Sequence, residues 1–287
     1  MKLGTFKYRE RIFPGVVEGE EVYDLSQSFE QNKGLEDLRG FLAKEDALAK
    51  LENGKLSLLG SGIVYKLGKV RVMAPLLNPG KIICIGWNYL KHADEAGSKL
   101  PEEPVFFNKF ATSIIGPDAS IILPAVSKQV DYEAELAVVI GKRGKGITEE
   151  EAMEYVAGYT AFNDISARDL QFKDQWVKGK ALDTFAPLGP FLVTKDEVSD
   201  PHNLRIRLLL NDQVMQDAST GIMIFKIPTL ISFLSQLFTL EPGDIIATGT
   251  PEGVGFTRDP RVFLKPGDRL TVSIERVGEL NNPVVGV

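Results

Sequence analysis

Two glutamates spaced two residues apart stand at the start of a predicted buried strand. The segment Asp131–Lys142 reads DYEAELAVVIGK, and Leu136–Ile140 is the apolar, partly β-branched run of such a strand. Since side chains alternate along a strand, Glu133 and Glu135 share one face. Neighbouring carboxylates repel each other unless a cation lies between them, and oxygen ligands favour a hard divalent ion. The pair therefore indicates a metal site or, alternatively, the solvent face of an exposed sheet edge.

A histidine and a glutamate could supply general-base chemistry. The segment WNYLKHADEAGS follows the short apolar strand KIICIG, and it is predicted to form a helix from near Asn88 to Gly97. His92 and Glu95 are three residues apart and face the same side of such a helix. A carboxylate beside an imidazole orients the ring and raises its basicity. An exposed ion pair on the helix surface is the alternative.

A third carboxylate and further polar side chains follow along the chain. The segment GYTAFNDISARDLQ is predicted to run from a strand into a short helix. Asp164 lies at the junction of the two elements, and Arg168 and Gln171 lie on the following turns. Asp164 could cap that helix or act as a third oxygen ligand for a metal ion. Lys180 lies in QWVKGKALDTFAPLGP, a loop-like segment in which a lysine is usually solvated.

Around these residues the sequence predicts many short strands and few helices, which is an α+β fold. PVFFNKFATSIIG and SIILPA are predicted strands with Lys109 between them, and LRIRLLL with NDQVMQ forms a predicted hairpin. Helices are predicted after the capping box that begins at Thr148 and from Pro228 through PTLISFLSQLF. The glycine-rich GTPEGVG is a weak phosphate-loop candidate, because it lacks the Lys-Ser/Thr pair and a following helix pattern.

The first part of the chain is predicted to form a small separate unit. Residues 1–73 contain short predicted strands, and GLEDLRGFLAKEDALAKL has the apolar spacing of a helix. Two prolines and a glycine within Pro75–Gly80 make this segment the best boundary candidate. The prediction is a small N-terminal α/β domain over residues 1–73 and a second domain over residues 74–287.

Composition places the chain among ordinary globular proteins. Of its 287 residues 44% are hydrophobic and 25% are charged, and a net charge of −6 without a basic tract argues against nucleic acid as a partner. No run is apolar enough to span a bilayer and the start lacks the apolar part of a secretory signal, so a cytoplasmic protein is expected. The single cysteine, Cys84, excludes an internal disulfide, and with only His92 and His202 no Cys/His zinc cluster is possible.

Taken together, these segments resemble the fumarylacetoacetate hydrolase family. The matching stretches are GWNYLKHADE, PVFFNKF, DYEAELAVVIGK, FNDISARDLQ, VKGKALDTFAPLGP and GDIIATGTPEGVG, in the order and spacing of the family. Within the family, the GKALDTFAPLGP motif is most similar to that of the fumarylacetoacetate hydrolase domain-containing type 2 proteins and their bacterial relatives. The resemblance implies a strand-rich mixed β-roll as the catalytic domain, usually in a homodimer.

The resemblance also implies roles for particular side chains. By this resemblance, Glu133, Glu135 and Asp164 are the ligands for Mg²⁺ or Mn²⁺. His92 and Glu95 are the water-activating pair, and Lys180 is one further catalytic group. The substrate-binding residues are Arg168, Gln171, Thr250 and Lys109. In one departure, Asn88 stands where the founding hydrolase has an additional Asp ligand, so the substrate of that enzyme does not follow from the resemblance.

The expected activity is metal-dependent hydrolysis of a carbon–carbon bond in a small acylpyruvate or fumaryl-type diketo acid. Water activated by His92 and Glu95 would add to the distal keto group, with the departing enolate stabilised by the metal ion. Because three carboxylates exceed the charge of one divalent ion, an anionic substrate would also need Lys180 and Arg168. The alternative on the same scaffold is an oxaloacetate decarboxylase or an enol–keto isomerase of 2-oxo acids. A metal-stabilised scaffold without activity is a third hypothesis, which the acid–base pair disfavours.

Overall fold

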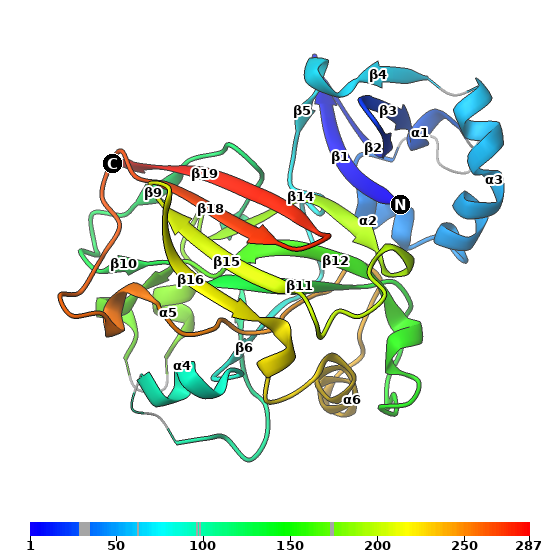
Figure 1. The fold of residues 1–287 in the computed structure, drawn as a ribbon. Coiled ribbons are helices and arrows are strands. Elements are labelled where there is room, and N and C mark those ends of the chain that lie inside the picture. Colours follow the sequence, from blue (N-terminus) through cyan, green and yellow to red (C-terminus); the bar gives the residue numbers. More distant parts are fainter. Residues whose placement is uncertain (29–34, 62, 96, 98, 173–174) are drawn as a thin grey trace.

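The computed structural model describes residues 1–28, 35–61, 63–95, 97, 99–172 and 175–287 (Figure 1). A 12-stranded mixed sheet forms its centre, in the order β4-β3-β2-β1-β14-β12-β11-β17-β6-β7, with β5 paired to β1 and β8 paired to β14. Its strands are β1 (Lys2–Tyr8), β2 (Arg11–Glu18), β3 (Glu21–Asp24), β4 (Val64–Lys66), β5 (Arg71–Val72), β6 (Ile82–Gly86), β7 (Val105–Lys109), β8 (Ile114–Ile115), β11 (Ala134–Ile140), β12 (Val156–Asn163), β14 (Ala186–Thr194) and β17 (Ile245–Ala247).

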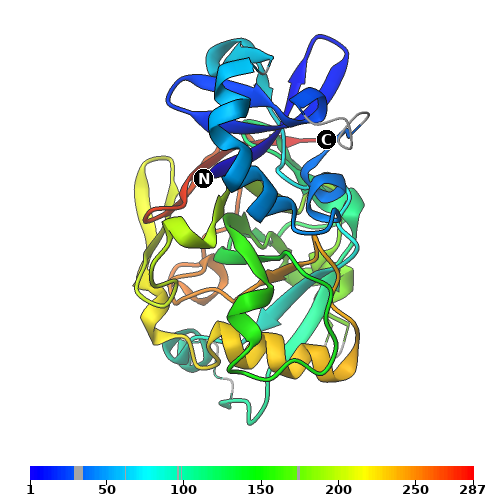
Figure 2. The same ribbon diagram turned by 90° about the vertical axis from the view of Figure 1, so that its right-hand side faces the viewer.

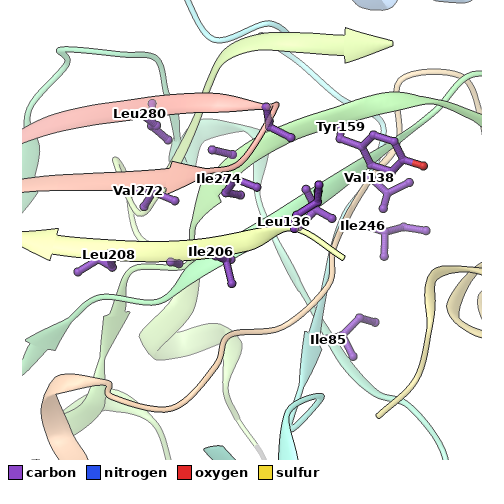
Figure 3. Packing of buried hydrophobic residues seen from close by; sticks show 14 of the residues in the cluster. Ile85, Leu136, Val138, Tyr159, Ile206, Leu208, Ile246, Val272, Ile274 and Leu280 are labelled. Atoms are coloured by element: carbon purple, nitrogen blue, oxygen red, sulfur yellow. The ribbon is translucent and has the colours of Figure 1, made fainter. Parts of the chain in front are cut away.

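A second, five-stranded sheet packs against the large one. Its order is β16-β15-β18-β19-β9, from β9 (Ile121–Leu123), β15 (Arg205–Leu210), β16 (Gln213–Ser219), β18 (Arg269–Ile274) and β19 (Gly278–Gly286). Figure 3 shows the packing, in which Leu136 and Val138 of the large sheet meet Ile206, Val272 and Ile274 of the smaller one. These side chains are at most 2% exposed. The two sheets thus enclose the main core, and the predicted strand-rich α+β class is confirmed.

The position of β11 explains why it is apolar on both faces. It lies between β12 and β17 in the large sheet. Leu136, Val138 and Ile140 contribute to the core shared with the smaller sheet, while Ala137 and Val139 contribute to a second core on the opposite face. A strand buried on both faces needs a continuous apolar run. β11 is therefore not the exposed sheet edge that the sequence left open for its glutamates.

Helices are few and short. They are α1 (Leu25–Ser28), α2 (Leu38–Leu42), α3 (Ala47–Ser61), α4 (Leu90–Glu95), α5 (Val177–Lys180) and α6 (Ile227–Leu237). The helix predicted near α2 is two helices, because the chain turns between them and Asp46 adopts a left-handed φ of 53°. The capping contacts of Thr148 with Glu151 form, yet only a 3-10 turn follows before β12 begins. Among the described residues, no helix is both long and apolar enough to cross a membrane.

The N-terminal strands continue the large sheet and do not form a sheet of their own. β1 pairs with β14, where Lys2 lies opposite Val193, and the elements of this part gather at one end of the molecule (Figure 2). Phe6, Phe13 and Val22 form a small core within it. The division of the chain after residue 73 into two domains stays a prediction.

Candidate active site

Three carboxylates converge where the central strands of the large sheet meet their loops. Glu135 lies on β11, Glu133 precedes that strand, and Asp164 directly follows β12. The Asn163 side chain accepts a hydrogen bond from the Glu133 amide at 3.0 Å, and the Asp164 amide donates to the Glu133 carbonyl at 2.9 Å. Carboxylate oxygens of the three residues lie within 4.8 Å of one another, and all three side chains are buried. The backbone pairing of β11 with β12 therefore sets the geometry of this cluster.

Three cations contact two of the three carboxylates. Lys180 Nζ lies 2.7 Å from Glu133 Oε2 and 2.9 Å from Asp164 Oδ2. The Arg168 guanidinium lies 2.7 Å from Glu133 Oε1, and Lys109 Nζ lies 2.7 Å from Asp164 Oδ1. Lys180 ends the one-turn helix α5 and is 3% exposed, so it is not the solvated lysine usual for such a loop.

The carboxylates of Glu133 and Glu135 differ in charge environment. Burial raises the pKa of Glu133, but the attraction of Lys180 and Arg168 outweighs it and lowers that pKa to about 2. Burial and the negative charges of Asp164 and Glu133 raise the pKa of Glu135 well above its usual value. Glu135 has no ion-pair partner among the residues that the structure describes.

The carboxylate cluster fits a hard divalent cation. Its donors are all carboxylate oxygens, which Mg²⁺ and Mn²⁺ prefer. Glu135 is the member that lacks a positive partner, and it accepts a hydrogen bond from the Gly249 amide at 3.0 Å. A cation beside Glu135 would offset the repulsion that it receives from the other two carboxylates. These residues are therefore able to hold a metal ion.

A histidine on α4 lines the same cavity, and its carboxylate partner lies behind it. His92 Nδ1 lies 2.9 Å from Glu95 Oε1. The Gly253 amide donates to Glu95 at 3.0 Å and 3.2 Å, which fixes the carboxylate. Trp87 stacks on the imidazole with ring centroids 5.3 Å apart. In the tautomer with its hydrogen on Nδ1, His92 keeps Nε2 free to accept a proton.

A cavity of about 220 Å³ lies between these groups. Seven of the ten predicted site residues line it: His92, Glu133, Glu135, Arg168, Gln171, Lys180 and Thr250. Its volume is below the range of pockets for drug-sized ligands, so a small molecule fits best.

The other three predicted residues act from behind the lining. Glu95 and Asp164 contact His92 and Lys180, respectively. Lys109 is oriented away from the cavity, because its ammonium donates to the carbonyls of Ile165, Phe185 and Lys180 besides its ion pair with Asp164. With these four oxygens around it, Lys109 has no donor left for a substrate, which differs from the contact predicted for it.

Several lining residues were missed by the sequence reasoning. Trp87, Phe107, Trp176 and Phe256 form aromatic parts of the wall. Trp176 can approach because Gly86 has no side chain, and a Cβ there would lie 2.4 Å from its ring. Phe107 lies on β7 and the other three lie outside strands and α-helices, and single aromatic residues of this kind give no periodic signal in the sequence.

Two buried amides support the site from behind. Gln216 donates to Thr250 Oγ1 at 2.9 Å and accepts from the Ala134 amide at 2.9 Å, which joins the smaller sheet to the carboxylate cluster. Asn88 donates to the Thr248 carbonyl at 2.7 Å and accepts from the Phe225 amide at 2.7 Å. Asn88 is thus a structural anchor for the start of α4.

The fold has a counterpart in a solved enzyme. The crystal structure of maleylpyruvate hydrolase from Sphingobium sp. SYK-6, in complex with manganese(II) ion and pyruvate, matches with a TM-score of 0.81 and 32% identity over 100% of this chain and 99% of that chain. The profile described as "Fumarylacetoacetate (FAA) hydrolase C-terminal" matches residues 81–285. The chain therefore belongs to the fumarylacetoacetate hydrolase family, which is a family of enzymes.

Curated relatives narrow the comparison within this family. "Oxaloacetate tautomerase fahd2, mitochondrial" from Xenopus laevis is 49% identical over 251 residues, which are 86% of this chain and 78% of the relative. "Oxaloacetate tautomerase FAHD2A, mitochondrial" from Homo sapiens is 48% identical over 244 residues, which are 84% of this chain and 78% of the relative. Both names state a mitochondrial protein, and on this finding the expected cytoplasmic location is wrong.

Proposed function

We propose that this chain is a divalent-metal-dependent tautomerase that interconverts the enol and keto forms of oxaloacetate. The observation that carries the proposal is a small cavity lined both by Glu133 and Glu135 of the carboxylate cluster and by His92 of the His92–Glu95 pair. This pairing of a metal-binding group with a proton acceptor suits exchange of a proton beside a carbonyl group. The identity of 49% to a protein named as an oxaloacetate tautomerase supports the choice of substrate. This proposal replaces carbon–carbon hydrolysis as the leading hypothesis.

The metal ion of the proposed enzyme is Mg²⁺ or Mn²⁺, held by Glu133, Glu135 and Asp164. When bound, it would polarise the 2-oxo group and so make the neighbouring carbon more acidic. The manganese ion in the similar maleylpyruvate hydrolase supports this class of ion.

The proton transfer is assigned to His92. In the keto-to-enol direction its Nε2 would accept the proton from C3 of the substrate, and the resulting imidazolium would deliver that proton to the 2-oxygen of the enolate. In the reverse direction the imidazole would take the proton from the enol oxygen and place it on C3. Glu95 keeps the ring oriented through Nδ1 at 2.9 Å. Since Glu95 also accepts from the Gly253 amide, the loop after β17 contributes to this orientation.

Binding of the substrate anion is assigned to Lys180, Arg168, Gln171 and Thr250. Two carboxylates account for two of the three ammonium hydrogens of Lys180, which leaves one for a substrate oxygen. Arg168 is in contact with Gln171 Oε1 at 3.4 Å from one of its amino groups. Since both side chains line the cavity, this edge of the guanidinium is suited to a substrate carboxylate.

Hydrolysis of an acylpyruvate is the second candidate function. The same His92–Glu95 pair favours it, because an oriented imidazole can also take a proton from water. The similarity to the maleylpyruvate hydrolase points in the same direction, at the lower identity of 32%. Decarboxylation of oxaloacetate is a third reaction through the same enolate.

One assay separates the three reactions. Enol oxaloacetate, diluted from an aprotic solvent into buffer with Mn²⁺, should lose its ultraviolet absorbance faster with the enzyme than without it, and EDTA should remove the difference. Lactate dehydrogenase and NADH in a parallel sample report pyruvate. Enol loss without pyruvate supports tautomerisation. Pyruvate from oxaloacetate above the metal background would instead establish decarboxylation, and pyruvate with acetate from acetylpyruvate would establish hydrolysis.

A homodimer is a further part of the proposal. β7 lies at the end of the large sheet, and Val105, Phe106 and Phe110 on and after it are 36%, 40% and 53% exposed. An apolar strand at a sheet edge is a favourable surface for a second copy. Sedimentation velocity at micromolar concentration tests this, and a species with the mass of one chain would contradict it.

A further inference from the structure

Asp131 is a buried carboxylate to which neither the metal nor the proton transfer gives a role. It ends the two-residue strand β10 (Val130–Asp131), which pairs with β13 (Ser166–Ala167). In this pairing Asp131 lies opposite Ser166, two residues before Arg168. Its side chain is 0% exposed. A carboxylate without access to water requires strong partners.

All of the hydrogen-bond partners of Asp131 are donors. Oδ1 accepts from the amides of Tyr132 and Gly255, both at 2.8 Å. Oδ2 accepts from the Phe256 amide at 3.0 Å and from Arg168 Nε at 2.9 Å, and a second Arg168 nitrogen lies at 2.8 Å. Such a set of donors suits an ionised carboxylate and leaves no place for a hydrogen on either oxygen.

On one side these contacts fix the orientation of Arg168. Arg168 Nη2, which lies 2.8 Å from Asp131 Oδ2, also lies 2.7 Å from Glu133 Oε1. One guanidinium group therefore bridges the two carboxylates. The guanidinium carbon lies 4.3 Å from the centroid of the Phe256 ring. Its remaining edge, toward Gln171, is therefore presented in one direction only.

On the other side these contacts hold the loop that reaches the His92–Glu95 pair. The Gly253 amide, two residues before Gly255, donates to both oxygens of Glu95. Gly255 sits so close to Asp131 that an added Cβ would lie 2.6 Å from Oδ1 and 1.9 Å from the Val262 carbonyl oxygen. The loop can therefore approach Asp131 only with glycine at this position.

We propose that Asp131 is a positioning residue that fixes two separate parts of the site, Arg168 on the substrate side and the 253–256 loop that orients Glu95. Its effect on turnover rests on the proposed function, whereas its hold on the loop does not. Asp131 touches neither substrate nor metal in this role and acts through its two partners.

The test is Asp131→Asn, which preserves the shape of the side chain but turns one oxygen into a donor that faces other donors. We expect KM for oxaloacetate to rise and kcat to fall, each by about 10-fold, because second contacts of this kind typically change activity by 10- to 100-fold. The affinity for Mn²⁺, measured by titration calorimetry, should stay within about threefold. Asp169→Asn is the matched control, since this exposed acid adjoins Arg168 in sequence but bonds to Ser127 and Lys128.

Two double-mutant cycles separate positioning from a general loss of structure. In an Arg168→Gln background, Asp131→Asn should no longer raise KM, and in a Glu95→Gln background it should no longer lower kcat. Additive effects in both cycles, or kinetics within twofold of the parent, would overturn the proposal.

A readout without turnover keeps the inference independent of the proposed reaction. Hydrogen exchange of a peptide that covers residues 250–258 should speed up at least 10-fold in Asp131→Asn and remain unchanged in Asp169→Asn. If the parent enzyme does not turn over oxaloacetate, the proposed function is wrong. The exchange result then still tests whether Asp131 holds the 253–256 loop. If Asp131→Asn does not fold, Asp131→Glu provides the second variant, which keeps the charge but moves the carboxylate by one methylene group. It should raise KM and speed up exchange of the 250–258 peptide, and KM and exchange equal to those of the parent would overturn the proposal.

Discussion

The two walls of the cavity are built in different ways. The carboxylate wall consists of Glu133 and Glu135, with Asp164 behind them, and it lies on or next to β11 and β12, which are paired with neighbours on both sides. The dyad wall consists of His92, with Glu95 behind it, and it lies on α4, a helix of six residues. Beyond its own backbone, α4 is held by side-chain contacts: Glu95 with Gly253, the Lys91–Glu252 ion pair at 3.3 Å, the Trp87 ring on His92, and Asn88 at the start of the helix.

This difference teaches which part of the chemistry needs a rigid frame. Metal ligands must keep their mutual distances, and a buried sheet supplies them because each strand residue is fixed by ladder bonds and core packing. A proton acceptor must approach the substrate after it has entered, and a short helix held by side-chain contacts, outside any strand ladder, can adjust more easily. We therefore expect changes in the carboxylate wall to act on metal binding and changes in the dyad wall to act on turnover alone.

The largest effect is expected from breaking the carboxylate wall with Glu135→Gln. Metal-dependent turnover should fall by about 10³-fold, since a bound ion contributes several kcal/mol to transition-state stabilisation. Mn²⁺ binding should become undetectable in titration calorimetry. The melting temperature in EDTA should not fall, because the change removes a buried negative charge that has two like-charged neighbours. Glu150→Gln on the surface is the control, and unchanged Mn²⁺ binding in Glu135→Gln would contradict the assignment.

The next effect is expected from breaking the dyad wall with His92→Gln. Loss of the proton acceptor should lower kcat by about 10²-fold, the lower end of the usual contribution of a general base. The Mn²⁺ affinity should stay within about twofold, measured in the same titration. A loss of metal affinity as large as that of Glu135→Gln would show that the two walls are not separable.

A smaller effect is expected when only the orientation of the histidine is disturbed. Glu95→Gln keeps an oxygen for the Gly253 amide but loses the charge beside the imidazole. Steady-state assays should show kcat about 10-fold lower and KM nearly unchanged, because second contacts of a catalytic group usually matter at that scale. If kcat falls as far as in His92→Gln, Glu95 takes part in the proton transfer itself.

The smallest effect concerns acid stability away from both walls, at His202. Burial lowers the pKa of His202, with a further lowering by Lys226 that Asp200 opposes, and its Nε2 accepts from the Ile227 amide at 3.1 Å where α6 begins. Because the folded-state pKa lies below the unfolded value of about 6.5, the unfolded chain binds more protons as the pH falls. The stability that neutral His202 contributes is present above pH 6.5 and is lost as the pH falls through its folded pKa.

Urea unfolding at pH values from 7.5 to 5 measures this loss. The midpoint should fall toward pH 5 in the parent protein, and less so in His202→Gln, which cannot take up the proton. Equal slopes in the two proteins would assign the acid sensitivity to other groups.

Much of this architecture could be predicted from the sequence, and the exceptions have physical causes. The apolar run of β11, the Pro228 start of α6 and the hairpin of β15 and β16 are local patterns, and each prediction is confirmed. The helix expected after Thr148 was wrong, because the following residues pair in β12 and tertiary pairing overrode a correct local cap.

Within the site, side chains with charge and motif context were easier to find than those with packing roles. Glu133, Glu135 and His92 stand in patterns whose chemistry is visible in their spacing. Asp131 adjoins the same motif but acts through the distant Gly255, which no pattern in its own segment reveals. Lys109 was recognised as a candidate, yet its contacts with three backbone carbonyls depend on long-range folding.

The pairing of β1 with β14 has a consequence for the order in which the chain is made. Lys2 lies opposite Val193. β1 therefore cannot pair with β14 until about 190 further residues have left the ribosome. At synthesis rates of about 5 to 20 residues per second, this interval is roughly 10 to 40 s. During it, β1 can pair with β2 and, at Phe6 and Lys7, with β5, but the backbone groups of Lys2 and Leu3 on its other edge stay free for any strand nearby. The N-terminal strands therefore join the rest of the large sheet only after Val193 has left the ribosome.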